Sequence, residues 1–447
     1  MRQRCACFPL LNDLIRKTFK RLPTATEWGR FQKYARRMQE VNEFGTLGFL
    51  SLEVLTSLQL HIVNEPLLPN LKSLYLWRVH GQFVPFIPLF VSPRTTSILL
   101  RFLPNAPKPM VASMLTTIPK LCLDLQTISL CSLPRDPVIT SAVSEMVLTT
   151  NRNTLQEFHV ESPLTEEASK VVYRLPNLCD LSVVIQGETS LPSASLPDLI
   201  KLEITCDNED AWPRLFHGAM LGKLESVTFS HRSKEIGDFL KTFENAALSS
   251  SVQNTLSEFH LSSSCSWNPN YSSLLPFTQL VDLEILFSCN FGCSSRVDDD
   301  VIVNLSRAMP RLQALQLGHE PCREFAIGVT TIGLMALALH CPNLRSLCIH
   351  FQVVSLISPP VNLGMTPDVE PTVSWTDCAL TELAAGYMPV PEGSTLMIAL
   401  ALLRIFPRIH IVDSDSDNGG WKEVEDAIRL SKQIVDFSSK QCTFTTH

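Results

Sequence analysis

A pattern of leucines with fixed internal spacing recurs along almost the whole chain and constrains the fold more than any other feature. Its form is Leu-x-x-Leu-x-Leu, often preceded by an apolar residue and a proline. Most neighbouring copies start 21 to 32 residues apart, which is typical of repeated structural units. The clear copies are LPNLKSLYL (68–76), LPNLCDLSV (175–183), LPDLIKLEI (196–204), MPRLQALQL (309–317) and CPNLRSLCI (341–349). Weaker copies lie at 123–130, 154–160, 223–229, 255–261 and 278–285, with further candidates at 92–100 and 55–60.

This spacing predicts the α/β fold class, as a leucine-rich-repeat solenoid, or horseshoe. Short parallel strands would line its concave face and helices its convex face. In a strand, alternate side chains point to opposite sides, so Leu74 and Leu76 should enter the core while Ser73, Tyr75 and Trp77 face outward. One unit cannot bury its own leucines, but stacked units share a continuous core.

The segments between copies carry helical patterns. Residues 298–310 begin with acidic residues and place Val301, Leu305 and Ala308 at helical spacing. Residues 330–342 are apolar nearly all round, which predicts a helix buried between its neighbours. The apolar segment 396–406 is interpreted in the same way, as a buried helix.

The domain organisation follows from where the repeats stop. We expect an N-terminal segment at 1–25, then an amphipathic capping helix at 26–45 that starts from the N-cap Thr26 and runs to Val41. Repeats follow at 46–353, and a proline-rich loop or insertion at 354–377. C-terminal repeats and a capping helix occupy 378–437, with a helix from Trp421, and 438–447 is a tail.

Composition excludes several functional classes. The formal net charge is -7 and no long run of lysine or arginine is present, so we expect no nucleic-acid partner. Apolar segments are too short for a signal peptide or a membrane span, so we expect no membrane association. The 14 cysteines are irregularly spaced, which favours a reduced setting in the cytoplasm, the nucleus or both.

The candidate motifs for catalysis, metal binding and cofactor binding lack residues or spacings that those functions require. The segment 413–425 resembles the start of a calcium-binding loop, but Asn418 and Val424 stand where glycine and glutamate are required. Cys265, Cys289 and Cys293 match no zinc-binding spacing. We therefore expect no metal, no cofactor and no enzymatic activity.

The register of the repeat assigns the outward side chains copy by copy. Acidic residues outnumber basic ones seven to one among them, and Tyr75 and Trp77 are the large aromatics. We predict that this face binds a protein or peptide carrying basic groups, with the aromatics as anchors near one end. The alternative, that these are ordinary solvated strand residues, stays open. The candidate partner-binding residues are Tyr75, Trp77, Glu157, His159, Asp180, Glu203, Glu258, His260, Asp282 and Glu284.

Five segments together resemble fungal F-box proteins of the basidiomycete type that carry leucine-rich repeats. They are WGRFQKYARRM, LLPNLKSLYLW, AMPRLQALQLG, HCPNLRSLCIHFQV and DSDSDNGGWKEVEDAI. In that family an N-terminal F-box docks on the Skp-type adaptor of a cullin ubiquitin ligase, and the repeats recruit a protein substrate. The resemblance implies a substrate-recognition subunit that acts without chemistry of its own.

The chain departs from that family at its N-terminus. Residues 9–23 offer at most one helix that resembles part of the box, with Leu11, Leu14, Ile15 and Phe19 on its apolar face as possible adaptor-docking residues. We expect either a truncated sequence or a lost ligase connection. The alternative function is a leucine-rich-repeat interaction protein with no ubiquitin-ligase link.

Overall fold

The computed structural model describes residues 24–46, 52–61, 66–186, 196–206, 221–231, 239–264, 269–288, 297–319, 328–357, 378–384, 388, 390–413 and 420–444. The chain divides into two compact units. Of the described residues, unit 1 contains those up to Thr205 together with Leu221, and unit 2 contains Cys206 and those from Gly222 onward.

Unit 1 alternates strands with helices. Its strands are β1 (Glu40–Thr46), β2 (Ser73–Val79), β3 (Ser97–Phe102), β4 (Thr127–Cys131), β5 (Glu157–Pro163), β6 (Asp180–Ile185) and β7 (Lys201–Cys206). Its helices are α2 (Ala25–Ala35), α3 (Leu52–His61), α4 (Ile87–Phe90), α5 (Lys108–Leu121), α6 (Pro137–Thr149) and α7 (Glu166–Val172), with a 3₁₀ turn η2 (Gly81–Phe86). Strands β1 to β7 lie in chain order, and those from β1 to β6 pair in parallel.

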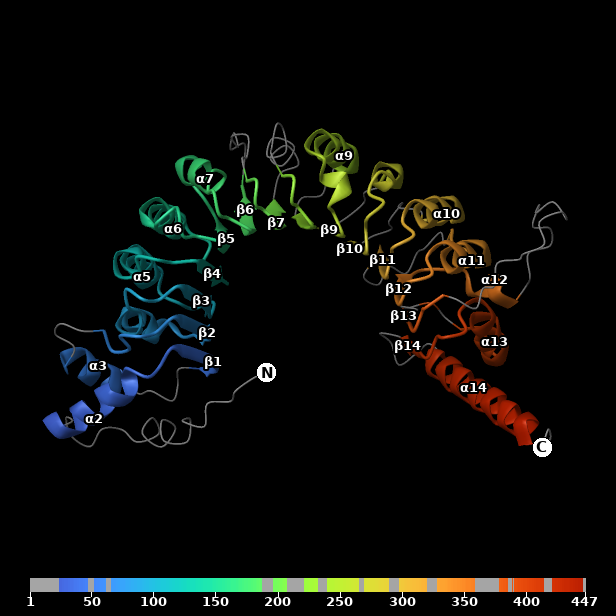
Figure 1. The fold of residues 1–447 in the computed structure, drawn as a ribbon, viewed down its shortest axis with the longest axis horizontal. Helices are drawn as coiled ribbons and strands as arrows, with labels where there is room; N and C mark the ends of the chain where they lie inside the picture. Colours follow the sequence, from blue (N-terminus) through green and yellow to red (C-terminus); the bar gives the residue numbers. More distant parts are fainter. Residues whose placement is uncertain are drawn as a thin grey trace. The chain divides into compact units, whose positions relative to one another are not determined.

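Unit 2 repeats the same alternation. Its strands are β8 (Ser226–His231), β9 (Glu258–Ser264), β10 (Asp282–Ser288), β11 (Ala314–His319), β12 (Ser346–Ile349), β13 (Glu382–Ala384) and β14 (Ile411–Asp413), all paired in parallel and in chain order. Its helices are α9 (Phe239–Ser250), α10 (Asp299–Ala308), α11 (Thr331–His340), α12 (Val353–Ile357), α13 (Thr395–Ile405) and α14 (Trp421–Phe444), with 3₁₀ turns η3 (Val252–Asn254) and η4 (Tyr271–Leu274). Within each unit the strands lie side by side and the helices lie on one side of them (Figure 1).

The leucine pattern defines the core. In every clear or weaker copy, the leucine that starts the Leu-x-x-Leu-x-Leu pattern is at most 2% exposed, as the sequence predicts. These leucines are Leu71, Leu125, Leu155, Leu178, Leu199, Leu224, Leu256, Leu280, Leu312 and Leu344. Leu74 and Leu76 are buried, while Ser73, Tyr75 and Trp77 are half-buried on the opposite side of β2. The copy at 92–100 is also confirmed, since β3 lies there. Its first position is Thr95, whose buried hydroxyl donates a hydrogen bond to the carbonyl of Leu71 at 3.1 Å. The fold is therefore α/β, with parallel strands in the predicted register.

Most successive repeats are joined by a recurring pair of backbone hydrogen bonds at the start of the strand. The carbonyl of Gln156 accepts from the N–H groups of both Cys179 and Asp180, at 2.8 and 3.1 Å. In unit 2, the carbonyl of Ser257 accepts from Val281 and Asp282 at 2.7 and 3.0 Å. Because each carbonyl bonds two consecutive N–H groups of the next repeat, strand starts are aligned and the side-chain register is carried along the unit.

The N-terminal elements differ from the expectation. The N-cap is Thr24, not Thr26, because the Thr24 hydroxyl and the Glu27 side chain form a reciprocal capping box. The helix ends at Ala35 instead of Val41, and residues 40–46 form β1, paired with β2. The copy at 55–60 is also wrong as a strand. It lies in α3, whose buried residues Val54, Leu55 and Leu58 have helical spacing.

Several helices bury faces other than the expected ones. In α10 the residue facing the core is Ile302, with Leu305, whereas Val301 and Ala308 are only half-buried. In α11 Leu334 and Leu337 are buried and Ile332 is exposed. The helix at 396–406 is buried on one side only, because Leu396, Met397 and Leu400 of α13 are 56%, 53% and 47% exposed.

The boundaries near the C-terminus also move. Helix α12 takes the first residues of the segment predicted as a loop at 354–377, whose remainder lies outside the described residues. Helix α14 continues to Phe444, through most of the predicted tail. Trp421 at its start is buried. The indole N–H of Trp421 donates to the carbonyl of Met388 at 2.7 Å, and the ring packs edge-on against Phe351. This contact fixes α14 to the end of unit 2.

The junction between α10 and α11 depends on Asp299. Its Oδ1 accepts hydrogen bonds from the backbone N–H groups of Thr330 and Gly333, at 2.8 and 2.9 Å, and its Oδ2 accepts one from the Thr330 hydroxyl at 2.6 Å. A carboxylate at a helix N-terminus satisfies free N–H groups and interacts favourably with the helix dipole. One side chain therefore caps the helix of the following repeat.

Replacing Gly333 with alanine tests this junction. A Cβ atom there would lie 2.7 Å from Asp299 Oδ1 and 3.0 Å from Val329 Cγ1. We expect Gly333→Ala to lower the free energy of unfolding by about 1–3 kcal/mol, measured by urea denaturation. Gly222→Ala is the matched control, because a Cβ there meets no atom within 4 Å. Equal stability of the two variants would contradict the close approach of the Asp299 carboxylate to α11 at Gly333.

Candidate functional site on the strand face

The strand face is the set of outward side chains on the strands of each unit, on the side away from the buried leucines. Every candidate residue from 75 to 284 lies on it. The structure places Tyr75 and Trp77 on β2, Glu157 and His159 on β5, Asp180 on β6, Glu203 on β7, Glu258 and His260 on β9, and Asp282 and Glu284 on β10. The predicted adaptor-docking residues Leu11, Leu14, Ile15 and Phe19 lie outside the described residues, as do Cys265, Cys289 and Cys293.

The aromatic residues are not brought next to the carboxylates of unit 1. Strands β3 and β4 lie between β2, which carries Tyr75 and Trp77, and β5, which carries Glu157. The Tyr75 hydroxyl lies 3.2 Å from the Ser97 hydroxyl on β3. This contact joins the half-buried Tyr75 side chain to the neighbouring strand β3.

In unit 1 three polar residues of β5 and β6 form one cluster. Glu157 lies opposite Asp180 in the β5–β6 register, and its Oε2 accepts a hydrogen bond from the Thr127 hydroxyl at 3.1 Å. His159 lies opposite Ser182, and its Nε2 reaches Asp180 Oδ2 diagonally at 3.4 Å. The carboxylates therefore have partners of their own within the face.

In unit 2 the cluster is more acidic. Glu258 lies opposite Asp282, and His260 lies opposite Glu284, where unit 1 has a serine. His260 Nδ1 is 2.8 Å from Glu284 Oε2. Burial raises the pKa of the Asp282 carboxyl above its ordinary value. His260 lowers this pKa, while Glu258 and Glu284 raise it further. Asp282 is therefore a carboxylate whose charge is poorly accommodated by its surroundings.

Sequence reasoning missed several residues of this face. Arg101 is exposed on β3 and adds a positive charge, and Glu382 is exposed on β13 and adds a negative one. Glu161, which the register of the repeat already assigns to the outward side, is exposed near the end of β5 and accepts a hydrogen bond from the backbone N–H of Ser132. The alternation of the repeat could have found Arg101, because the residue after the buried Leu100 points outward.

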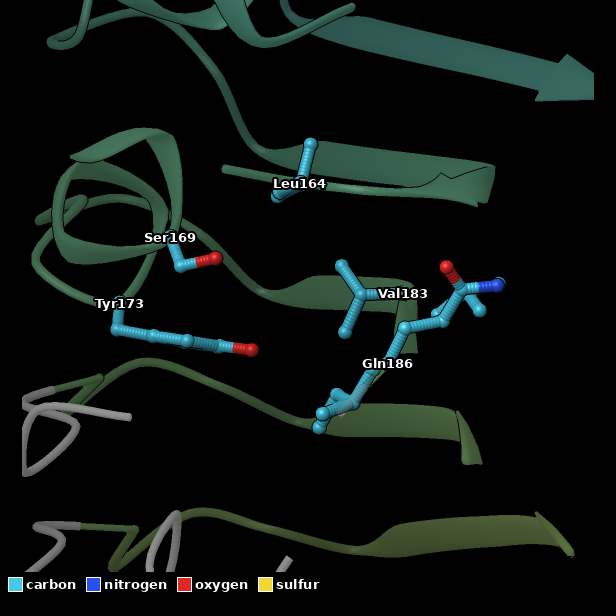
Figure 2. A pocket seen from close by; sticks show the side chains of 7 residues that line it. Leu164, Ser169, Tyr173, Val183 and Gln186 are labelled. Carbon is cyan, nitrogen blue, oxygen red and sulfur yellow. The ribbon is translucent and has the colours of Figure 1, made fainter. Parts of the chain in front are cut away.

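A cavity in unit 1 lies beneath the strand face. Its volume is about 10 Å³, and it is lined by Leu164, Ser169, Tyr173, Val183, Val184, Ile185 and Gln186. Figure 2 shows Ser169 and Tyr173 projecting toward Val183 on β6. A space of this size has room for about one water molecule, so it cannot serve as a binding site for a larger ligand.

Burial raises the pKa of five of the described thiols. Burial raises the pKa of Cys122 and of Cys341 to about 12, although a hydrogen bond with Thr95 partly opposes the rise at Cys122. Burial also raises the pKa of Cys131, Cys179 and Cys378. A nucleophilic cysteine needs the opposite shift, a lowered pKa.

Within the described part of the chain, no group of three or more His, Cys, Asp or Glu side chains is arranged to hold a metal ion. Among the described helices, none combines the length and apolar character that a membrane span requires.

Comparisons with known proteins give no family for this chain. No protein-family model matches it, and no curated protein matches it either.

The raised pKa of Asp282 makes a prediction about stability. Because the folded carboxyl keeps its proton to higher pH than the unfolded one, ionised Asp282 lowers the free energy of unfolding at neutral pH. We expect Asp282→Asn to be more stable than the unmodified protein at pH 7. The difference should shrink as the pH falls through the raised pKa toward the ordinary carboxyl value, where both side chains are uncharged.

Urea denaturation at several pH values measures this difference. The exposed Asp124 supplies the control Asp124→Asn, which should change stability little at any pH. A loss of stability on Asp282→Asn at pH 7 would contradict the unfavourable charge environment described for Asp282.

Proposed function

We propose that this protein is a non-enzymatic, protein-binding scaffold built from leucine-rich repeats. The proposal combines the L-x-x-L-x-L register with parallel strands and helices that alternate in both units. Repeats of this kind present the strand side as a continuous surface for a partner, because the helices occupy the other side. The resemblance to F-box proteins extends the proposal to a substrate receptor of the cytoplasm or nucleus.

The acidity of the strand face supports a basic protein or peptide as the partner. Carboxylates stand on the consecutive strands β5, β6 and β7 in unit 1, and on β9 and β10 in unit 2. Strand β7 also carries Lys201 and β3 carries Arg101, so the acidity is strongest along β9 and β10. Charge complementarity steers encounter and selects partners, even where it adds little affinity. Tyr75 and Trp77 supply the aromatic contacts that frequently dominate binding energy.

The single observation that carries the proposal is the cluster formed by Glu258, Asp282 and Glu284 on adjacent strands. Burial and like charge disfavour ionisation of Asp282, so the cluster reduces stability at neutral pH. A bound lysine or arginine would neutralise that charge, which gives the arrangement a use in recognition.

Charge reversal tests the basic-partner proposal. A fluorescein-labelled octalysine peptide serves as the probe in anisotropy titrations at pH 7.5 and low salt. We expect the combined variant Glu203→Lys, Asp282→Lys and Glu284→Lys to weaken binding by about tenfold or more. The control variant Asp124→Lys, Glu145→Lys and Glu392→Lys makes the same change in net charge at exposed positions away from the strands. Equal loss in both variants would mean that total charge, and not the strand face, governs binding.

The ubiquitin-ligase link is tested separately. A purified Skp-type adaptor is titrated against the full chain, and against a variant carrying Leu11→Ala, Leu14→Ala, Ile15→Ala and Phe19→Ala. If the segment docks as the family resemblance implies, the full chain binds and the variant loses about tenfold or more in affinity. Absence of binding by the full chain would favour the alternative, a repeat scaffold without a ligase connection.

A further inference from the structure

Strands β5 and β9, one in each unit, share a sequence that the rest of the repeats lack. They read EFHV at 157–160 and EFHL at 258–261. Each strand buries its phenylalanine completely and turns its glutamate and histidine outward. A threonine three residues before each glutamate anchors the strand to the preceding repeat. Thr154 donates to the carbonyl of Leu125 at 2.8 Å, and Thr255 to that of Leu224 at 2.7 Å. The two histidines therefore lie at equivalent positions of strands that are anchored in the same way.

Each of these histidines contacts a carboxylate on the following strand. The distances are 3.4 Å from His159 Nε2 to Asp180 Oδ2, and 2.8 Å from His260 Nδ1 to Glu284 Oε2. Both histidine side chains are 25% exposed, so protons and partner side chains can reach them. The same type of contact therefore occurs twice, although the carboxylate comes from a different strand position in each unit.

The charged groups that face His260 are all acidic. They are Glu258 on its own strand and Asp282 and Glu284 on β10, while β8 presents the uncharged Ser226 and Thr228. His231 of β8 is buried on the other side. Protonation of His260 therefore places a positive charge among the acidic side chains of β9 and β10.

The charged groups around His159 are acidic as well. Its own strand carries Glu157 and Glu161, and Asp180 lies on β6. Strand β4 presents Thr127, Ser129 and Cys131, and neither β4 nor β6 contains lysine or arginine. When both histidines are neutral, the carboxylates keep their full charge. When they are protonated, Asp180 and Glu284 are each neutralised by an ion pair.

We propose that lysine or arginine side chains of a basic partner bind at these two histidine–carboxylate pairs, and that the protonated histidines compete with them. This inference rests on the proposed function, because it concerns the same strand face. Histidine is the side chain that most readily gains a proton under mildly acidic conditions, so the partner should bind at neutral pH and dissociate as the medium acidifies. The competing histidine both neutralises the carboxylate and repels the incoming cation.

Octalysine binding at two pH values tests the competition. Anisotropy titrations at low salt compare the unmodified protein at pH 7.5 and pH 5.5, where we expect about tenfold weaker binding at the lower pH. In the double variant His159→Gln and His260→Gln the same change should weaken binding by less than about threefold. Glutamine can still donate a hydrogen bond to the carboxylate, but it cannot become charged.

His410→Gln is the matched control. His410 is exposed at the end of unit 2, and its Nδ1 lies 3.1 Å from the carbonyl of Arg408. This variant should keep the full pH dependence. Circular dichroism at both pH values confirms that each variant is folded.

The possible outcomes distinguish failure of the competition from failure of the basic-partner proposal. If the double variant loses octalysine at pH 5.5 as strongly as the unmodified protein does, the competition is overturned and the basic-partner proposal survives. The competition is likewise overturned if the unmodified protein binds octalysine equally at both pH values. If octalysine binds at neither pH, the basic-partner proposal fails and the competition fails with it.

Discussion

The leucines at the first position of each repeat are buried because the neighbouring repeat covers them, and the rest of the structure depends on this shared burial. Leu155, Leu256 and Leu280 are at most 2% exposed, although each belongs to a single repeat of about 20–30 residues that is too short to enclose its own leucines. Burying a leucine side chain contributes about 1.5–3 kcal/mol. Removing one repeat would therefore expose leucines of two neighbours, and stability is a property of the stack.

Burial of the leucines and the backbone hydrogen bonds together fix the register of the strands. At most strand starts, one carbonyl bonds two consecutive N–H groups of the next repeat. A slip of one residue would break both bonds and would also turn the buried leucines outward. The same constraint aligns the outward side chains, so that Glu258 stands beside Asp282 and His260 beside Glu284. The register that buries the leucines therefore also fixes which outward side chains lie next to each other on the strand face.

The parts predicted well are those in which one periodic pattern decides the structure. The strands from β2 to β12 lie where the copies place them, because hydrophobic alternation and the preceding turn agree. The prediction fails where two patterns compete or where a contact distant in sequence decides. LTSLQL has the spacing of a strand copy, but its position between β1 and β2 requires a helix. Residues 40–46 lack the leucines of a repeat, yet the exposed edge of β2 makes a strand of them. Helix α14 continues to Phe444, beyond the predicted end near Phe437.

The sequence by itself determined the repeat, the α/β class and the side of each strand on which Glu157, His159, Glu258 and His260 lie. These follow from local spacing, because alternation in a strand allows no other assignment. Only the tertiary structure decided which side chains meet. His159 reaches Asp180 diagonally because Ser182 stands opposite it, while His260 contacts Glu284 directly. That difference arises from pairing between strands more than twenty residues apart, which no local pattern specifies.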